Sequence, residues 1–92
     1  MESKDLKSGS IYVVVSGEVA RHEYVVPGAI LGVYLEGCLS AIFFHQYIST
    51  YVESLHGVSF RETSPEECKV ATFDVDAGVW RRNRKSGIGY GY

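Results

Sequence analysis

The sequence predicts a single small α+β domain, roughly ββαβββ, in which one long helix lies across an antiparallel sheet. Of its 92 residues, 46% are apolar and 22% are charged, which is the composition of a globular protein and argues against disorder. Runs rich in β-branched and aromatic residues occur on both sides of a long, nearly uncharged central stretch. We therefore expect one folded domain over residues 1–80, followed by a basic segment over residues 81–92.

The first predicted elements form a β-hairpin. Residues 11–15 are a β-branched and aromatic run, residues 16–18 (Ser-Gly-Glu) read as a turn, and residues 19–26 form the second strand. Pro27 ends that strand, because proline lacks an N–H group and fixes φ. Proline also suits the first turn of a helix, so a helix is expected to follow.

The central stretch, residues 28–56, is predicted to be that helix, with Gly57 as its C-terminal stop. At about 100° per residue, Glu36 heads a polar stripe along the helix, and apolar residues gather on the opposite side. The stripe argues against a membrane span, where a central carboxylate would cost roughly 2.5 kcal/mol or more. We therefore expect a helix packed on the sheet, with Glu36 at least partly exposed. Its buried side supplies the candidate core or ligand face: Tyr34, Cys38, Ala41, His45 and Ile48.

The C-terminal third is predicted to hold three strands. Residues 58–62 (VSFRE) form a short strand, and residues 63–67 form a loop around a proline. Residues 68–75 alternate in polarity and form the next strand. Residues 76–78 (Asp-Ala-Gly) are a turn into a last strand over residues 79–83.

The length of the predicted helix favours a homo-oligomer. A helix of about 28 residues would be roughly 42 Å long. A globule of this size has a radius of gyration of about 12 Å, so the helix must either break or extend into a second subunit. The small core and the seven tyrosines, which suit interfaces, favour the same conclusion.

Spacing excludes a metal site on the predicted helix. Cys38, His45 and His56 share one stripe, but steps of seven and eleven residues rise about 10 and 16 Å, too far for one zinc ion. The same separation prevents Cys38 and His45 from acting as a nucleophile and its base. No metal and no cofactor is therefore expected. A small enzyme with a site between subunits remains an alternative, with His22, His45 and Cys68 as candidates.

Charge is divided unevenly along the chain. Residues 1–79 carry five Lys or Arg against eleven Asp or Glu, whereas residues 80–92 carry four cations and no acid. Cations interleaved with aromatic residues suit phosphate contact and base stacking, which makes nucleic-acid binding an alternative function. A charged edge strand explains the same pattern, and the acidic body would repel a polyanion. The candidate polyanion-binding residues are Trp80, Arg81, Arg82, Arg84 and Lys85.

Two stretches, PGAILGVYLEGCLSAI and GVSFRETSPEECKVATFDV, resemble the ligand-binding domain of the four-vinyl-reductase family and the related small subunits of the Golgi tethering particle. The shared pattern is a Gly-x-x-x-Gly helix with a trailing Leu and Gly, then a strand ending in acidic and Thr residues, then a Cys-Lys-apolar strand. The helix is about ten residues longer than in that family, and the family's Gly-Asp turn with its first Cys is missing. The resemblance implies a dimerising scaffold that holds a hydrophobic ligand or tethers partners without catalysis. The matching residues are Gly28, Gly32, Leu39, Gly57, Glu62, Thr63, Cys68, Lys69 and Val70.

The expected function is therefore that of a soluble, non-enzymatic binding or assembly module that acts as a homo-oligomer. Its expected partner is a hydrophobic small molecule or another protein. The first ten residues are polar, so no cleavable leader is expected. Two cysteines without a secretory signal fit a reducing compartment, which predicts a cytoplasmic location.

Overall fold

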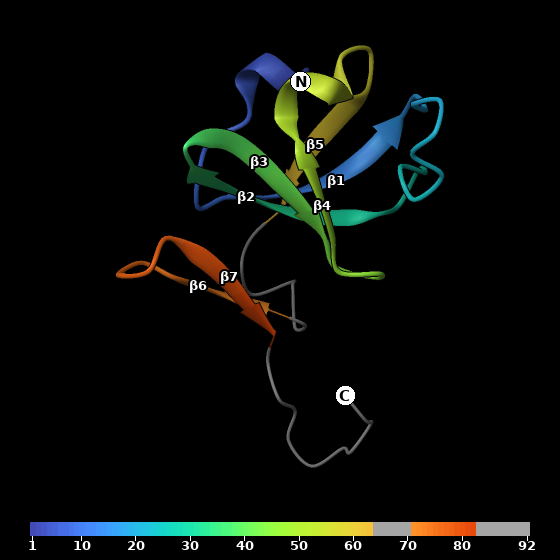
Figure 1. The fold of residues 1–92 in the computed structure, drawn as a ribbon. Coiled ribbons are helices and arrows are strands. Elements are labelled where there is room, and N and C mark those ends of the chain that lie inside the picture. The colour runs from blue at the N-terminus through green and yellow to red at the C-terminus, as the bar shows by residue number, and fades with distance from the viewer. Residues whose placement is uncertain (64–70, 83–92) are drawn as a thin grey trace, which may run out of the picture.

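The computed structural model describes residues 1–63 and 71–82 and shows an all-β protein, so the α+β prediction is wrong (Figure 1). Five strands form one antiparallel sheet in the order β4-β3-β2-β1-β5, and two more form a separate hairpin, β6-β7. No helix within the described residues is long and apolar enough to cross a membrane. The elements are η1 (Ser3–Asp5), β1 (Ile11–Ser16), β2 (Ile30–Glu36), β3 (Cys38–Phe43), β4 (Ile48–Tyr51), η2 (Val52–Leu55), β5 (Ser59–Thr63), β6 (Ala71–Asp74) and β7 (Val79–Arg82), where η marks a single 3-10 turn.

The predicted helix over residues 28–56 is replaced by β2, β3, β4 and η2. Gly37 sits at the apex between β2 and β3 with a φ of +76°, a conformation that glycine adopts without steric cost and that interrupts a helix. On either side of it the strands pair from Leu31↔Phe43 to Glu36↔Cys38. Val, Ile, Tyr and Phe favour strands, and each glycine inside a helix would have cost about 1 kcal/mol. Glu36 is exposed as expected, but at the end of a strand.

The predicted N-terminal hairpin is half right. β1 corresponds to the predicted strand over residues 11–15. Residues 19–26 form a loop with one isolated bridge, Val19↔His22, instead of a second strand. β1 pairs with β2 on one side and with β5 on the other, so its neighbours come from later in the chain.

The C-terminal strand predictions are confirmed where the structure describes them. β5 and β7 match the predicted strands at residues 58–62 and 79–83, and β6 covers part of residues 68–75. Gly78 ends the predicted turn with a φ of +74°, and its N–H donates to the Asp74 carbonyl at 2.7 Å. The predicted loop at residues 64–67 and the tail at residues 83–92 lie outside the described residues.

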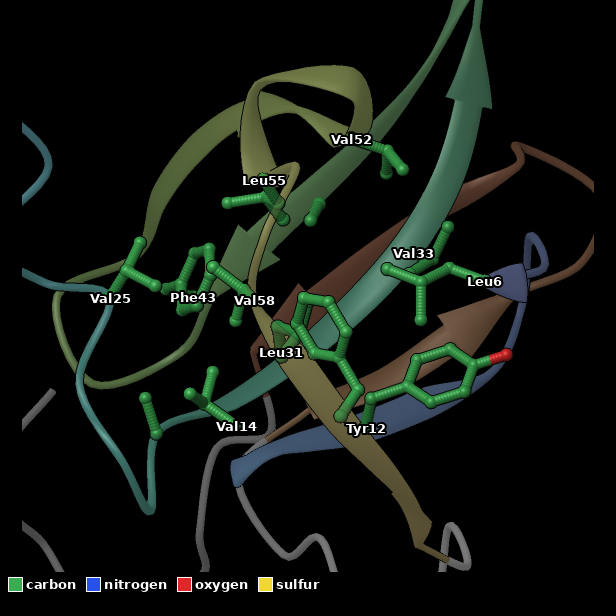
Figure 2. Close-up of a cluster of buried hydrophobic side chains, with 13 residues drawn as sticks. Leu6, Tyr12, Val14, Val25, Leu31, Val33, Phe43, Val52, Leu55 and Val58 are labelled. Carbon is green, nitrogen blue, oxygen red and sulfur yellow. The ribbon is translucent and has the colours of Figure 1, made fainter. Parts of the chain in front are cut away.

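The inner face of the rolled sheet encloses the main core (Figure 2). Leu31 and Val33 of β2 point inward beside their β3 partners Phe43 and Ala41, as strand alternation requires. The loop before β2 and the turn η2 close the core over the sheet. Its members are Leu6, Tyr12, Val14, Val25, Ala29, Leu31, Val33, Ala41, Phe43, Val52, Leu55, Val58 and Phe60.

The outer face of the same sheet is also apolar, and the β6-β7 hairpin covers it. Trp80 of β7 is the centre of this second cluster. Its indole N–H donates to the Val33 carbonyl at 3.0 Å, and its ring lies 5.5 Å from the Phe44 ring and 5.1 Å from the Phe73 ring, centroid to centroid. The cluster consists of buried Ile11, Phe44, Ala71 and Trp80, with partly buried Ile30, Tyr34, Ile42, Tyr47 and Phe73 around them.

Gly32 makes this docking possible. A Cβ on Gly32 would lie 2.5 Å from Trp80 Nε1 and 2.7 Å from Phe44 Cζ, closer than non-bonded atoms can approach. The indole therefore rests directly on the β2 backbone, in space that any other residue would fill.

We expect Gly32→Ala to displace the β6-β7 hairpin from the sheet. Overpacking of a filled core typically costs about 1–3 kcal/mol. Trp80 is the only tryptophan, so its emission should move to longer wavelength under native conditions while the inner core remains folded. Gly37→Ala is the matched control, because Gly37 has a positive φ but nothing within 4 Å of its Cβ position. That variant should lose stability without a shift in Trp80 emission. Native emission in Gly32→Ala identical to that of the parent would refute this account of the docking.

Candidate functional site

An apolar hollow of about 400 Å³ opens where β2 begins and β3 ends. Its volume falls within the range of roughly 300–1,000 Å³ that small-molecule sites occupy. Apart from one histidine, the residues of its lining that the structure describes are aliphatic, aromatic or glycine. The lining residues are Val26, Pro27, Gly28, Ala29, Ile30, Phe44 and His45.

One wall of the hollow is a tight turn over residues 26–29. The Ala29 N–H donates to the Val26 carbonyl at 3.0 Å, and Gly28 has a φ of +93°. Proline in the second position and a positive φ in the third are the features of a type II turn. Two further backbone hydrogen bonds fix the turn to β1, from Gly28 N–H to the Val14 carbonyl at 2.8 Å and from Val14 N–H to the Ala29 carbonyl at 2.9 Å. The wall is thus preorganised, and it holds Val26 at 44% exposure.

The other wall comes from the connection between β3 and β4. The Phe44 N–H donates to the Ile30 carbonyl at 3.1 Å, which holds the connection against the start of β2. The Phe44 side chain is buried between the hollow and the Trp80 ring. His45 is exposed and supplies the single ionisable side chain among the described residues of the lining.

The structure separates the five residues predicted to share a ligand face. Only His45 lines the apolar hollow. Ala41 is in the inner core, whereas Tyr34 lies on the outer face and donates its hydroxyl to Ser49 Oγ at 3.1 Å. Cys38 and Ile48 are exposed on strands. The predicted face belonged to a helix that does not form, so these positions have no common surface.

Three of the predicted polyanion-binding residues, Trp80, Arg81 and Arg82, lie in the described part of the chain and make other contacts. The Trp80 side chain is buried between the β6-β7 hairpin and the sheet, and Arg81 Nε donates to Asp74 Oδ2 at 2.8 Å. The Arg82 guanidinium carbon lies 4.2 Å from the centre of the Tyr47 ring, a cation–π arrangement. Arg84 and Lys85 lie outside the described residues.

The histidines and cysteines of the described ranges do not gather into a reactive cluster. No group of three or more His, Cys, Asp or Glu side chains there is placed to hold a metal ion. His22 Nδ1 lies 3.0 Å from the Tyr24 hydroxyl, and the Cys38 thiol is free and exposed. Cys68 lies outside the described residues.

Sequence reasoning missed the residues that form the hollow, in particular Val26, Ile30 and Phe44. The available signal was the dipeptide Pro27-Gly28, which is typical of a type II turn. If this dipeptide is interpreted as a turn, the predicted loop ends there and a strand is predicted from Ile30, where β2 begins.

Comparison with protein-family models, with curated proteins and with solved structures found no match. The resemblance to the four-vinyl-reductase and tethering-particle families therefore rests on its residues alone. The helix implied by its first stretch is replaced by β2 and β3.

The hairpin contains one carboxyl group with a shifted pKa. The hydrogen bond from Arg81, with a further one from the Ala77 N–H at 3.0 Å, lowers the pKa of Asp74 below its ordinary value. A carboxyl group whose pKa is lower in the folded than in the unfolded state stabilises the fold above the unfolded pKa. That contribution is lost as the pH falls through the folded pKa.

We expect Arg81→Gln to raise the titration midpoint of the Asp74 carboxyl toward the ordinary aspartate value. The measurement is the pH dependence of the Asp74 side-chain carbonyl shift by ¹³C NMR. Arg61→Gln, on β5, is the control and should leave the midpoint in place. An unchanged midpoint in Arg81→Gln would show that the ion pair with Arg81 does not lower the pKa of Asp74.

Proposed function

We propose that this protein is a non-enzymatic binding module whose apolar hollow takes the hydrophobic part of a ligand. The observation that carries the proposal is the hollow itself, a preorganised concavity with an almost wholly apolar lining. Burial of apolar surface is favourable by about 25 cal/mol per Å², so a ligand that covers Val26, Ile30 and Phe44 gains free energy without any change in the backbone.

The lining also indicates the chemistry of the ligand. The hollow offers apolar contact over most of its surface and one imidazole, that of His45, at a single place. A few placed polar groups in an otherwise apolar site fix the orientation of a ligand. A compact hydrophobic molecule with one polar group fits this arrangement, as does an apolar side chain of a partner protein.

The geometry supports the two alternative functions, nucleic-acid binding and catalysis between subunits, less well than it supports ligand binding. Nucleic-acid binding would use base stacking on Trp80, but its indole is buried and donates to the Val33 carbonyl. Catalysis between subunits would use His22 or His45. His22 is engaged with Tyr24, and no second reactive group from residues 1–63 or 71–82 lies beside His45 in the hollow.

Trp80 provides a direct assay for the proposed binding. Its ring lies 5.5 Å from the ring of Phe44, which lines the hollow. A bound dye that absorbs at the emission wavelength of tryptophan should therefore quench Trp80 by energy transfer. N-phenyl-1-naphthylamine is such a dye, and because it is apolar and neutral, added charge on the protein does not repel it.

We expect N-phenyl-1-naphthylamine to quench Trp80 saturably, and Val26→Glu to weaken its binding by about tenfold or more, equal to about 1.4 kcal/mol. A carboxylate at position 26 would have to be desolvated whenever the dye entered. Val15→Glu is the matched control, because Val15 is 51% exposed and does not line the hollow. Equal affinity in the two variants, or no saturable quenching in the parent protein, would rule out this site.

A further inference from the structure

The five-stranded sheet has two edges, and one of them is covered. β5 forms the first edge, where Met1 bonds to Phe60 in both directions. The Phe60 N–H donates to the Met1 carbonyl at 2.8 Å, and the Met1 amino group donates to the Phe60 carbonyl at 2.9 Å. Exposed Arg61 and Glu62 add charge beside this contact. Covering and charging an edge are two of the means by which proteins prevent strands of other chains from pairing.

β4 forms the second edge, and within the described residues it has neither protection. Its sequence, Ile-Ser-Thr-Tyr, contains no charge, no proline and no glycine, and three of its four residues favour strands. One side of β4 pairs with β3, and within residues 1–63 and 71–82 no strand pairs with the other side. Such an edge presents unpaired backbone N–H and C=O groups to a further strand. The two ends of β4 also expose apolar surface, with Ile48 at 37% and Tyr51 at 58%.

A second hollow lies beside this edge, on the outer face of the sheet. Its volume is about 460 Å³, and the Tyr34 hydroxyl donates a hydrogen bond to Ser49 Oγ between two of its lining residues. The described residues that line it supply two aromatic rings, several hydroxyl groups and one carboxylate. The lining residues are Tyr34, Glu36, Ser40, Ser49, Thr50 and Tyr51.

We propose that β4 pairs antiparallel with β4 of a second copy of this chain, joining the two sheets edge to edge. In such a pair the twofold axis is perpendicular to the sheet, so opposed residues lie on the same face of it. One residue must therefore lie directly opposite its own copy, with the axis between the two, and we assign this position to Thr50. Ser49 of one copy then opposes Tyr51 of the other, and each Tyr51 ring covers the outer-face hollow of its partner.

The composition of β4 favours a second copy as the occupant. Antiparallel self-pairing sets each residue against a residue of the same short strand, and like charges placed opposite one another would be destabilising. β4 carries no charge, so the pairing has no such cost. Tyrosine is also a frequent anchor at the centre of protein interfaces. With four residues per strand the buried area is small, which predicts a weak, concentration-dependent dimer. This proposal does not depend on ligand binding at the hollow beside Val26.

Disulfide trapping at the twofold axis tests the pairing and its register. In a chain whose Cys38 and Cys68 are replaced by Ser, we expect Thr50→Cys to form a covalent dimer under mild oxidation. Directly opposed residues in an antiparallel pair bring their Cα atoms to about 4.5–5.5 Å, within disulfide range. Val75→Cys, at the tip of the β6-β7 hairpin and 80% exposed, is the control for random collision. Efficient trapping by Ser49→Cys alone would support pairing of the two β4 edges but overturn the register. Trapping of Thr50→Cys no faster than Val75→Cys would overturn both.

Sedimentation of the full chain over a concentration series gives the independent readout. Tyr51→Lys should weaken self-association by at least about tenfold, because it removes the aromatic anchor and places a charge on the edge. Val75→Lys carries the same charge change and should associate like the parent protein. A dimer that Tyr51→Lys leaves intact would overturn the proposal. A protein that remains a monomer at all concentrations would also overturn it. If the β4 amide signals of that monomer shift when an unrelated extended peptide is added, the edge is assigned to a different chain.

Discussion

The contact between the Trp80 indole and the Gly32 backbone is the constraint on which the rest of the structure depends. β2 lies in the middle of the sheet and has apolar neighbours on both faces. The inner face is closed by the loop before β2 and by η2, and both follow directly after strands of the same sheet. Among the described residues, β6 and β7 cover the outer face, and Trp80 is the buried side chain at the centre of that docking. A residue larger than glycine at position 32 would occupy the space of the indole.

This constraint extends to the candidate site. Phe44 packs against Trp80 in a T-shaped arrangement and also lines the apolar hollow. One wall of the hollow therefore rests on the docked hairpin through Phe44, and the other is held by the type II turn at Pro27. Ligand binding and hairpin docking both involve Phe44. A substitution that displaces the hairpin should therefore also alter the affinity of the hollow for a ligand. The shared side chain also explains why the single tryptophan can report on the site.

How far the sequence predicts the fold depends on how each strand is buried. β1, β5 and β7 were predictable because they are short, rich in β-branched or aromatic residues, and bounded by turn residues. β2 and β3 were not, because both faces of their sheet carry apolar side chains and the run from Ile30 to Phe44 lacks clear alternation. An apolar run of this kind cannot be assigned to strand or helix by periodicity alone, and only Gly37 marks the turn within it. The glycines that suggested close helix packing instead serve a turn at Gly37 and a docking surface at Gly32.

The candidate site was less predictable than the fold, for a related reason. His45 was singled out as a member of a helix face, and it does line the hollow, but its neighbours there come from a loop and a turn that the helix prediction excluded. Tyr34 and Ile48 were expected beside it and lie elsewhere on the sheet. Loss of the long helix also removes one of the grounds for a homo-oligomer. The free side of β4, with which no strand of the described residues pairs, now supplies a different one. The arrangement of the paired strands was needed to reveal it.

The central claim, that the docked indole and the sheet form one cooperative unit, can be measured by hydrogen exchange at the Trp80 indole N–H. This proton donates to the Val33 carbonyl from a buried position. If the hairpin is an integral part of the fold, the indole proton should exchange only on global unfolding, as slowly as the backbone amides of Tyr12 and Leu31 in the inner core. Exchange orders of magnitude faster than at those amides would show that the hairpin opens by itself, and would contradict the account.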